Sequence, residues 1–282
     1  MKATEEIILP LVEKIPAFSQ SVSRVLALTS DINCSPRELV EVVSLDPVLT
    51  LKILKLVNSA YFGLAQKVTS IHHALVYLGL NTLKNITLSL AMIGALPRKN
   101  KAGFNADAFW LHSLGTGVAA RLLARTRRTP GDEAEEYFVA GLLHDVGKLV
   151  FARYMPEQFK DALKAAGEGG VSLCEAEKRA IGADHAEVGA MLAVKWQLSG
   201  ELAASLGRHH VPEEGEALPM LDAVFAADQT VKALGYGFSG DPTPRPLPEA
   251  VAARLGMNLE ELAASMPSLG GELDKARILI TL

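Results

Sequence analysis

The sequence is poor in cysteine, in aromatic residues and in net charge, and each shortage excludes a class of protein. Cys34 and Cys174 are the two cysteines; they lie far apart, cannot build a disulfide framework and fit a reducing compartment. Aromatic residues form 6% of the chain, so the core must consist mainly of Leu, Ala, Val and Ile. A net charge of -4 at pH 7 argues against tight binding to nucleic acid or to an anionic membrane.

Long apolar segments are also missing. The longest one, Leu88 to Leu96, is interrupted by Ser89 and Gly94 and is too short to span a bilayer. The N-terminus, MKATEEIILP, has no apolar stretch flanked by basic residues and therefore predicts no signal peptide. We expect a cytoplasmic protein that does not cross a membrane.

Apolar stripes with the period of a helix recur along the chain, whereas the alternation typical of strands does not. Ser35-Pro36, with Glu38, predicts a capping box, Asp46-Pro47 predicts a second helix start, and Gly79 predicts a helix end. The sequence therefore predicts an all-α protein with two helical lobes. The expected boundaries are residues 1–100 for the first lobe, 101–240 for the second, and 241–282 for a Pro-rich linker with a helical tail.

The stretch from Tyr137 to Tyr154 is an apolar helical stripe that contains His144, Asp145 and Lys148. On one helix, His144 and Lys148 lie on the same side, one turn apart, and Asp145 lies about 100° away. Buried polar groups need partners, so this pattern has two interpretations. The His-Asp pair is either a pair of metal ligands or a polar patch at a helix end, where Gly147 loosens the turn.

Further histidines and aspartates follow an order that suits a metal site. Each lies on, or at the end of, a separate predicted helix, and facing helices of a bundle commonly assemble such sites. Imidazole and carboxylate ligands suit iron, manganese or nickel better than a closed structural zinc site. The predicted ligands are His112, His144, Asp145, His185, His209, His210 and Asp228.

Two ions bridged by Asp145 would divide these ligands between them. The first ion would use His112, His144, Asp145 and Asp228. The second would use His185, His209 and His210, with Asp145 shared. Two bridged ions can clamp a phosphodiester and generate hydroxide, and Lys148 would stabilise phosphate charge. Asp145 and Lys148 are therefore the candidate catalytic residues.

Ordinary structural roles explain the same side chains one by one. His209 and His210 stand at a helix C-terminus, where the helix dipole favours histidine, and Asp184 before His185 is a common cap. Asp228 could cap a turn or pair with an arginine. Only the joint pattern favours a metal site.

Two further segments have alternative interpretations. Arg121, Arg125 and Arg128 share one predicted helical face, which either receives phosphate or an acidic partner or is a solvated surface. The aromatics in Asn58 to Gly63 either dock a partner or pack between the two lobes.

The order of these segments resembles the HDOD domain, the HD-related output domain of bacterial signalling proteins. The resemblance covers about residues 10–235 and rests on SLDPVLTLKILKLVNSAYFGL, TSIHHALVYLGLNTLKNITLSLA, FWLHS, AGLLHDVGKLV, DHAEVGAMLAVKW and RHH. It implies an all-helical fold whose second lobe is HD-like, and a regulatory role, often after the receiver domain of a two-component response regulator. It also implies kinship with the HD phosphohydrolases and with the HD-GYP phosphodiesterases of cyclic-di-GMP.

The sequence departs from both groups in one respect each. Most HDOD members are thought to lack the complete metal set, whereas this chain keeps a His or Asp at each position named above. Unlike HD-GYP proteins, it has no Gly-Tyr-Pro triplet near His209-His210, where Val211-Pro212-Glu213 follows. The missing triplet argues against hydrolysis of cyclic-di-GMP and leaves metal binding open.

We therefore expect a signal-transduction output module that acts through protein contacts rather than as an enzyme. Its partners would be other signalling proteins, such as a receiver domain or a sensor kinase. The alternative is a metal-dependent phosphohydrolase acting on a nucleotide or cyclic dinucleotide, and a nucleic-acid-binding regulator is disfavoured by the net charge. The expected cofactor is a divalent transition metal ion or none.

Overall fold

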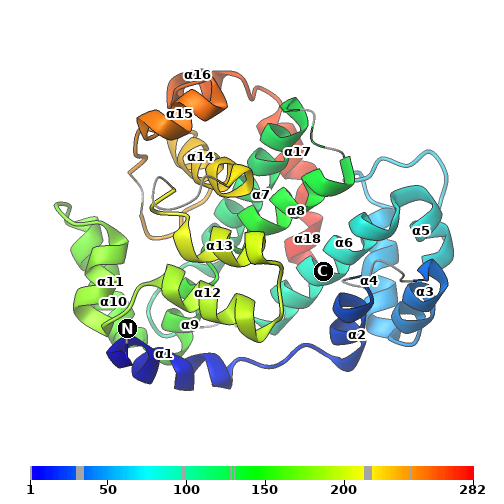
Figure 1. Cartoon of the computed structure of the whole chain (residues 1–282), viewed down its shortest axis with the longest axis horizontal. Helices are drawn as coiled ribbons and strands as arrows, with labels where there is room; N and C mark the ends of the chain where they lie inside the picture. Colours follow the sequence, from blue (N-terminus) through cyan, green and yellow to red (C-terminus); the bar gives the residue numbers. More distant parts are fainter. Residues whose placement is uncertain are drawn as a thin grey trace.

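A computed structural model describes residues 2–29, 35–96, 100–127, 129, 131–212, 218–241 and 243–282, and these are helical from α1 to α18 with no strand (Figure 1). The predicted all-α fold with two helical lobes is confirmed. Cys34, Arg128 and residues 97–99 of the predicted boundary between the lobes lie outside the described residues. No helix in the described part of the chain has the length and apolar character needed to cross a membrane.

The first lobe is a bundle in which α2 packs on α3 and α6, and α4 packs on α5 and α6. The Asp46 side chain caps α4 by accepting from the Leu49 amide at 3.0 Å, as expected. At Ser35 the predicted capping box is wrong, because α3 begins at Pro36 but the Ser35 hydroxyl does not cap it. The helices of this lobe are α2 (Gln20–Thr29), α3 (Pro36–Ser44), α4 (Pro47–Val57), α5 (Ile71–Leu78) and α6 (Leu80–Ala95).

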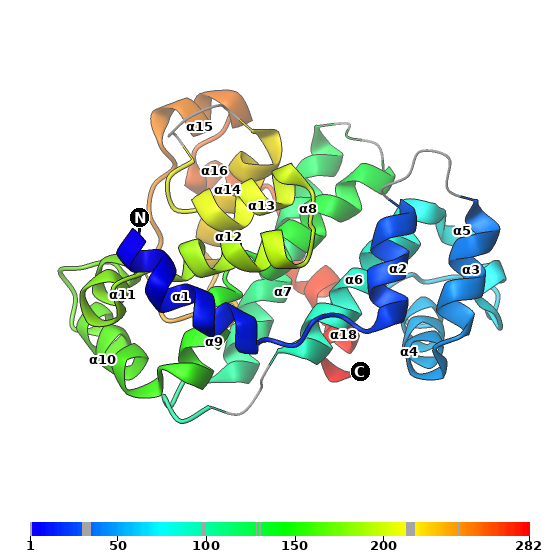
Figure 2. The same cartoon turned by 60° about the horizontal axis from the view of Figure 1, so that its bottom comes forward.

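The second lobe is built around α7, a long helix that packs on α8 and α14. Helix α1 (Lys2–Lys14) crosses from the N-terminus to pack on α9 and α12 (Figure 2). The helices of this lobe are α7 (Ala106–Thr126), α8 (Gly131–Leu143), α9 (Gly147–Tyr154), α10 (Pro156–Gly167), α11 (Leu173–Ile181), α12 (His185–Lys195), α13 (Gly200–Arg208) and α14 (Pro219–Ala233).

The C-terminal helices pack back onto both lobes. Helix α16 contacts α14, α17 contacts α7, and α18 contacts α6. The bounds of this region are α15 (Glu249–Leu255), α16 (Leu259–Ala264), α17 (Leu269–Ala276) and α18 (Ile278–Thr281). Packing of the tail on α7 and α14 helps to hold the two helices that contribute His112 and Asp228.

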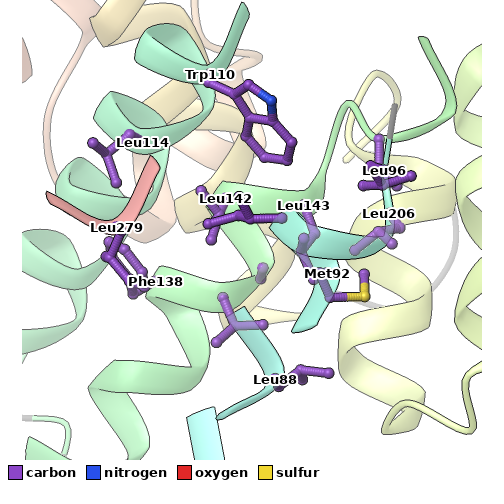
Figure 3. Packing of buried hydrophobic residues seen from close by; sticks show 14 of the residues in the cluster. Leu88, Met92, Leu96, Trp110, Leu114, Phe138, Leu142, Leu143, Leu206 and Leu279 are labelled. Atoms are coloured by element: carbon purple, nitrogen blue, oxygen red, sulfur yellow. The ribbon is translucent and has the colours of Figure 1, made fainter. Parts of the chain in front are cut away.

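Helix α6 joins the lobes through an apolar junction with α8. Figure 3 shows Met92 of α6 beside Leu143 of α8, and these two side chains are buried with Leu88 and Leu142 in one core cluster. Burial of such side chains contributes about 1.5–3 kcal/mol each. The junction therefore fixes α8, and the residues that follow it, against the first lobe.

A buried charged contact lies at the same junction. Arg121, at 4% exposure, donates to the Tyr61 hydroxyl, pairs with Glu135 at 3.4 Å and lies over the Phe138 ring. The aromatic segment that contains Tyr61 thus packs between the lobes, as one of its two interpretations proposed. Arg121 belongs to this contact rather than to a basic surface.

Candidate metal centre

The His-Asp pair lies in a break between two helices. The predicted single helix from Tyr137 to Tyr154 is wrong, because α8 ends at Leu143 and α9 begins at Gly147. Between them the Val146 amide donates to the Leu143 carbonyl at 3.0 Å, and the Lys148 amide donates to the Asp145 carbonyl at 3.0 Å. These tight turns, of the kind that often mark functional positions in helices, direct His144 and Asp145 away from either helix face.

Gly147 allows this break to approach the start of α12. A Cβ atom at Gly147 would lie 2.1 Å from the His185 carbonyl oxygen, which is a severe clash. The residue is therefore needed for close backbone approach, and not only to loosen a turn. The same approach brings His185 opposite Asp145.

Substituting Gly147→Ala is expected to destabilise the protein by about 3 kcal/mol, because an extra methyl group cannot be accommodated against a backbone oxygen. Gly94→Ala is the matched control, since Gly94 is also helical and its Cβ would meet nothing within 4 Å. That control should be neutral or stabilising by up to about 1 kcal/mol. Urea unfolding followed by circular dichroism measures both, and equal midpoints would contradict the role given to Gly147.

Asp145 lies at the middle of the converging imidazoles. Its Oδ1 atom is 3.1 Å from His185 Nε2 and 3.4 Å from His209 Nε2. Its Oδ2 atom is 3.3 Å from His144 Nε2 and 3.9 Å from His112 Nε2. One carboxylate thus faces four histidines from four segments of the chain.

Asp228 and His210 complete the set on opposite sides. The Asp228 Oδ1 atom is 3.0 Å from His112 Nε2 and 3.7 Å from His144 Nε2. His210 Nε2 is 2.7 Å from His185 Nε2. The structure therefore brings all seven predicted ligand residues together, in the two groups that the sequence suggested.

Most residues of the centre are buried, and five of their donor atoms lack hydrogen bonds to the described residues. Except for the partly buried His210, the seven residues are 0–1% exposed. Although neighbouring atoms lie within 4 Å, five atoms have no hydrogen bond of acceptable geometry to any described residue. They are the Nε2 atoms of His112, His144 and His209 and the Oδ1 atoms of Asp145 and Asp228.

Leaving several buried polar atoms without a partner costs about 1–3 kcal/mol each. Metal ions between these atoms would satisfy them all, and the donor types match those of transition metal sites. Each of two groups could bind one ion on the distances between its donor atoms, and Asp145 is common to both. One is Asp145, His185, His209 and His210, and the other is His112, His144 and Asp145.

Hydrogen bonds to backbone carbonyls fix the orientation of the His144 and His209 rings. His144 Nδ1 donates to the Gly141 carbonyl at 2.7 Å, and His209 Nδ1 donates to the Leu206 carbonyl at 3.0 Å. Because a carbonyl only accepts, Nδ1 holds a proton in both rings, so Nε2 is the nitrogen that can bind a metal once the ring is neutral. These contacts set the tautomer that coordination requires.

Glu177 orients the His185 ring in the same way, through a hydrogen bond to Nδ1. The sequence did not indicate this role. Its Oε2 atom is 2.6 Å from His185 Nδ1 and also accepts from the His185 amide at 2.9 Å. Glu177 lies on α11, eight residues before its partner, and no local pattern singles it out. Metal-binding histidines commonly have such a carboxylate behind them.

Each of the two carboxylates of the centre forms an ion pair with a buried lysine. Lys148 Nζ is 2.6 Å from Asp145 Oδ2, so the group expected to meet phosphate has a carboxylate partner in this structure. Lys232 Nζ is 2.9 Å from Asp228 Oδ2, on the next turn of α14. The sequence analysis missed Lys232, although its four-residue spacing from Asp228 is a recognisable signal for an ion pair.

Burial and charge shift the pKa values of neighbouring imidazoles in opposite directions. Burial dominates at His209 and lowers its pKa to about 4. At His144 burial also disfavours the charged ring, but the nearby carboxylates of Asp145 and Asp228 outweigh it and raise the pKa to about 9. Burial alone would raise the pKa of Asp145. The nearby charges of His144 and Lys148 outweigh burial, so the pKa of this carboxyl group lies well below its usual range. The centre thus contains both neutral and charged rings.

The sequence and the fold of the chain are both similar to those of known proteins. Residues 15–212 match the HDOD domain family. The chain belongs to the HDOD family. The match includes six of the seven converging residues, and Asp228 on α14 lies beyond its end.

Relatives of this HDOD chain include proteins of similar and of greater length. An uncharacterized protein of Treponema pallidum (strain Nichols) is 28% identical over 242 residues, which cover 84% of this chain and 46% of that protein. The HDOD chain therefore spans about half the length of the curated relative that it matches.

Solved structures share the fold along nearly the whole chain. An HDOD domain protein of unknown function from Geobacter sulfurreducens is 25% identical with a TM-score of 0.79, and the alignment covers 98% of this chain and 99% of that one. A Shewanella amazonensis SB2B protein named "Putative phosphohydrolase" is 26% identical with a TM-score of 0.74, covering 97% and 98%. Both comparisons extend past residue 212 and include the C-terminal helices.

Proposed function

We propose that this HDOD chain is an output module of bacterial signal transduction, which acts through protein contacts and holds metal ions without turning over a substrate. The observation that supports this most directly is the closure of the His/Asp centre. Turnover of a phosphate ester requires a metal-bound water, a place for the phosphate and an opening for the substrate. Here the ligands other than His210 are 0–1% exposed, and Lys148 is 1% exposed and paired with Asp145.

An exposed apolar stripe on the first lobe supports the protein contacts. Leu45, Val48 and Leu51 are 81%, 65% and 68% exposed. Val48 and Leu51 lie one turn apart on the same side of α4, and Leu45 lies between α3 and α4. Val48 also borders a hollow of about 340 Å³ between α4, α6 and residues 16–19. Contiguous exposed apolar side chains of this kind mark interaction surfaces.

The partners that we expect are other signalling proteins, with a receiver domain or a sensor kinase among them. Lys52 and Lys55 follow the apolar stripe on α4, so a fitting partner would present apolar side chains flanked by carboxylates. Because the chain spans about half of its curated relative, such a partner could be a further domain of the same polypeptide.

The ions that we propose are iron, manganese or nickel. One would be held by His112, His144, Asp145 and Asp228, and the other by His185, His209 and His210 with Asp145 shared. When bound, such ions supply Lewis acidity and lower the pKa of coordinated water. In this chain, Glu177, Lys148 and Lys232 would orient the ligands around them.

A metal-dependent phosphohydrolase is the second candidate function. The unpartnered Nε2 and Oδ1 atoms favour it, because a complete donor set is what a two-ion mechanism needs. The Shewanella amazonensis structure, at 26% identity, also carries the name "Putative phosphohydrolase". This candidate requires that the closed centre open to a substrate.

Hydrolysis assays separate the two functions. Iron- or manganese-loaded protein, with its metal content measured by mass spectrometry, is expected to show negligible hydrolysis of cyclic-di-GMP and of common nucleotides. Turnover at about 1 per second or faster, the lower range of ordinary enzymes, would instead establish the phosphohydrolase. That conclusion would also require His144→Ala or Asp145→Ala to abolish the activity. Protein that takes up no metal under the loading conditions would remove the ions from the proposed module.

A further inference from the structure

The segment between α14 and α15 lies over the His/Asp centre. Its Pro-rich part is the predicted linker. Residues 236–241 and 243–247, here called the strap, contact the second lobe at several points. Figure 2 shows the strap as an orange coil that leaves α15 and descends towards α10 and α11. A Cβ atom at Gly240 would lie 2.7 Å from Leu163 and 3.0 Å from Leu173, which places the strap directly against these two helices.

The first half of the strap is docked at the start of α7. The Phe238 amide donates to the Ala108 carbonyl at 3.0 Å, one turn before His112. Gly237 has a φ of +72°, and a Cβ atom there would lie 2.4 Å from the His112 amide nitrogen. The backbone of the strap therefore approaches the backbone of a predicted metal ligand as closely as a glycine permits.

Strap side chains also reach the lysines that hold the two carboxylates. Ser239 Oγ is 3.4 Å from Lys148 Nζ, and Asp241 Oδ2 is 3.8 Å from Lys232 Nζ. Each lysine thus bridges one carboxylate of the centre and one oxygen of the strap. The strap is thus linked to both halves of the centre through a lysine, by a hydrogen bond at Lys148 and by an ion pair at Lys232.

Arg245 fixes the far end of the strap. Its Nη2 atom is 3.3 Å from His210 Nδ1 and 3.3 Å from the His210 carbonyl oxygen. Its amide donates to Gln229 Oε1 at 2.6 Å, and Gln229 in turn donates to Asp228 Oδ2 at 2.8 Å. His210 is the ligand residue that is least buried, so Arg245 covers the side of the centre that is nearest to solvent.

We infer that the strap is a gate, and that solutes and metal ions reach the His/Asp centre only when it lifts. It suits this role because its described residues belong to no helix or strand, and a few polar contacts hold it in place. Segments of this kind open locally at a much lower free energy than the helices beneath them. The part of the inference that concerns ions rests on the proposed metal centre, whereas access to the histidines does not.

Two glycines of the chain provide a matched test. Gly237 and Gly235 have the same φ of +72°, so alanine at either position carries the same backbone strain. A Cβ atom at Gly237 collides with the start of α7, whereas one at Gly235 meets nothing within 4 Å. Gly237→Ala should therefore lift the strap, and Gly235→Ala should leave it docked. Arg245→Gln releases the other end without altering a glycine.

Reaction with diethyl pyrocarbonate measures access to the histidines in metal-free protein. His112 and His209 are the reporters, because burial lowers the pKa of both rings and their Nε2 atoms have no hydrogen bond to a described residue; exposed His72 and His73 are internal standards. We expect Arg245→Gln to accelerate modification of the reporters by about tenfold or more, as the loss of one charged hydrogen bond implies, and Gly237→Ala to have at least as large an effect because of its clash with α7. Gly235→Ala should match the wild type, and peptide mass spectrometry reads each site.

Metal-loaded protein gives the second readout, in which the rate of ion release to a chelator should follow the same order of variants. Equal rates in Gly237→Ala and Gly235→Ala, with Arg245→Gln like the wild type, would overturn the gate. Wild-type reporters that react as fast as His72 would also overturn it. If no variant retains an ion while the modification rates still separate, the gate stands and the metal centre fails. If Gly237→Ala does not fold, Arg245→Gln against the wild type decides.

Discussion

Replacing Asp145 by asparagine is expected to remove both ion positions and to destabilise the protein by about 3–5 kcal/mol. The two oxygens of Asp145 face His112, His144, His185 and His209, and an amide cannot supply the charge that two ions share. The substitution also leaves Lys148 buried without its partner at 2.6 Å. An uncompensated buried charge accounts for the large expected loss of stability.

A double variant separates the two consequences. In Asp145→Asn with Lys148→Met, the buried charge is gone, so most of the stability should return while the metal content stays near zero. Asp222→Asn is the matched control, because Asp222 is equally buried but its partner Arg254 is 33% exposed and can turn to water. Urea unfolding and metal analysis measure all three variants. Asp145→Asn with wild-type metal content would exclude the proposed centre, and Asp145→Asn no less stable than Asp222→Asn would exclude the burial argument.

The all-α class and the convergence of the seven His and Asp residues could be predicted from the sequence. Helical stripes repeat every 3.6 residues, and a bundle can bring together residues that lie on, or at the ends of, separate helices. The break at His144 could not be predicted in this way, because the apolar stripe continues through it without interruption. Its cause is a contact between Gly147 and the His185 carbonyl, which are 38 positions apart along the printed sequence.

Some of the residues that contact the predicted ligands could be predicted from the sequence, and others could not. Lys232 follows Asp228 by four residues, so helix geometry alone indicates their pairing. Glu177 and Arg245 contact His185 and His210 only through the tertiary fold, and nothing in their surroundings suggests it. The prolines near Arg245 exclude a helix, but they do not indicate which surface the segment covers.

Metal affinity is expected to fall about tenfold for each pH unit below about 9, because His144 must lose a proton before it can coordinate. The carboxylates of Asp145 and Asp228 outweigh burial and raise the pKa of His144 to about 9, so the ring is charged at neutral pH before an ion binds. His209 has a pKa lowered to about 4 by burial; it is already neutral and adds no dependence in this range. The pKa of His185 is also raised, because Glu177 and Asp145 outweigh burial, and this adds to the effect.

Calorimetric titration with manganese in two buffers of different ionisation enthalpy counts the protons. At about pH 7 we expect at least one proton released for each ion that His144 coordinates, and affinity that is about a hundredfold weaker at pH 6 than at pH 8. His144→Ala should bind less metal and lose one proton from the count, whereas His72→Ala, at an exposed position away from the centre, should match the wild type. Affinity that does not change between these pH values would mean that His144 is neutral in metal-free protein, and that the nearby carboxylates do not raise its pKa.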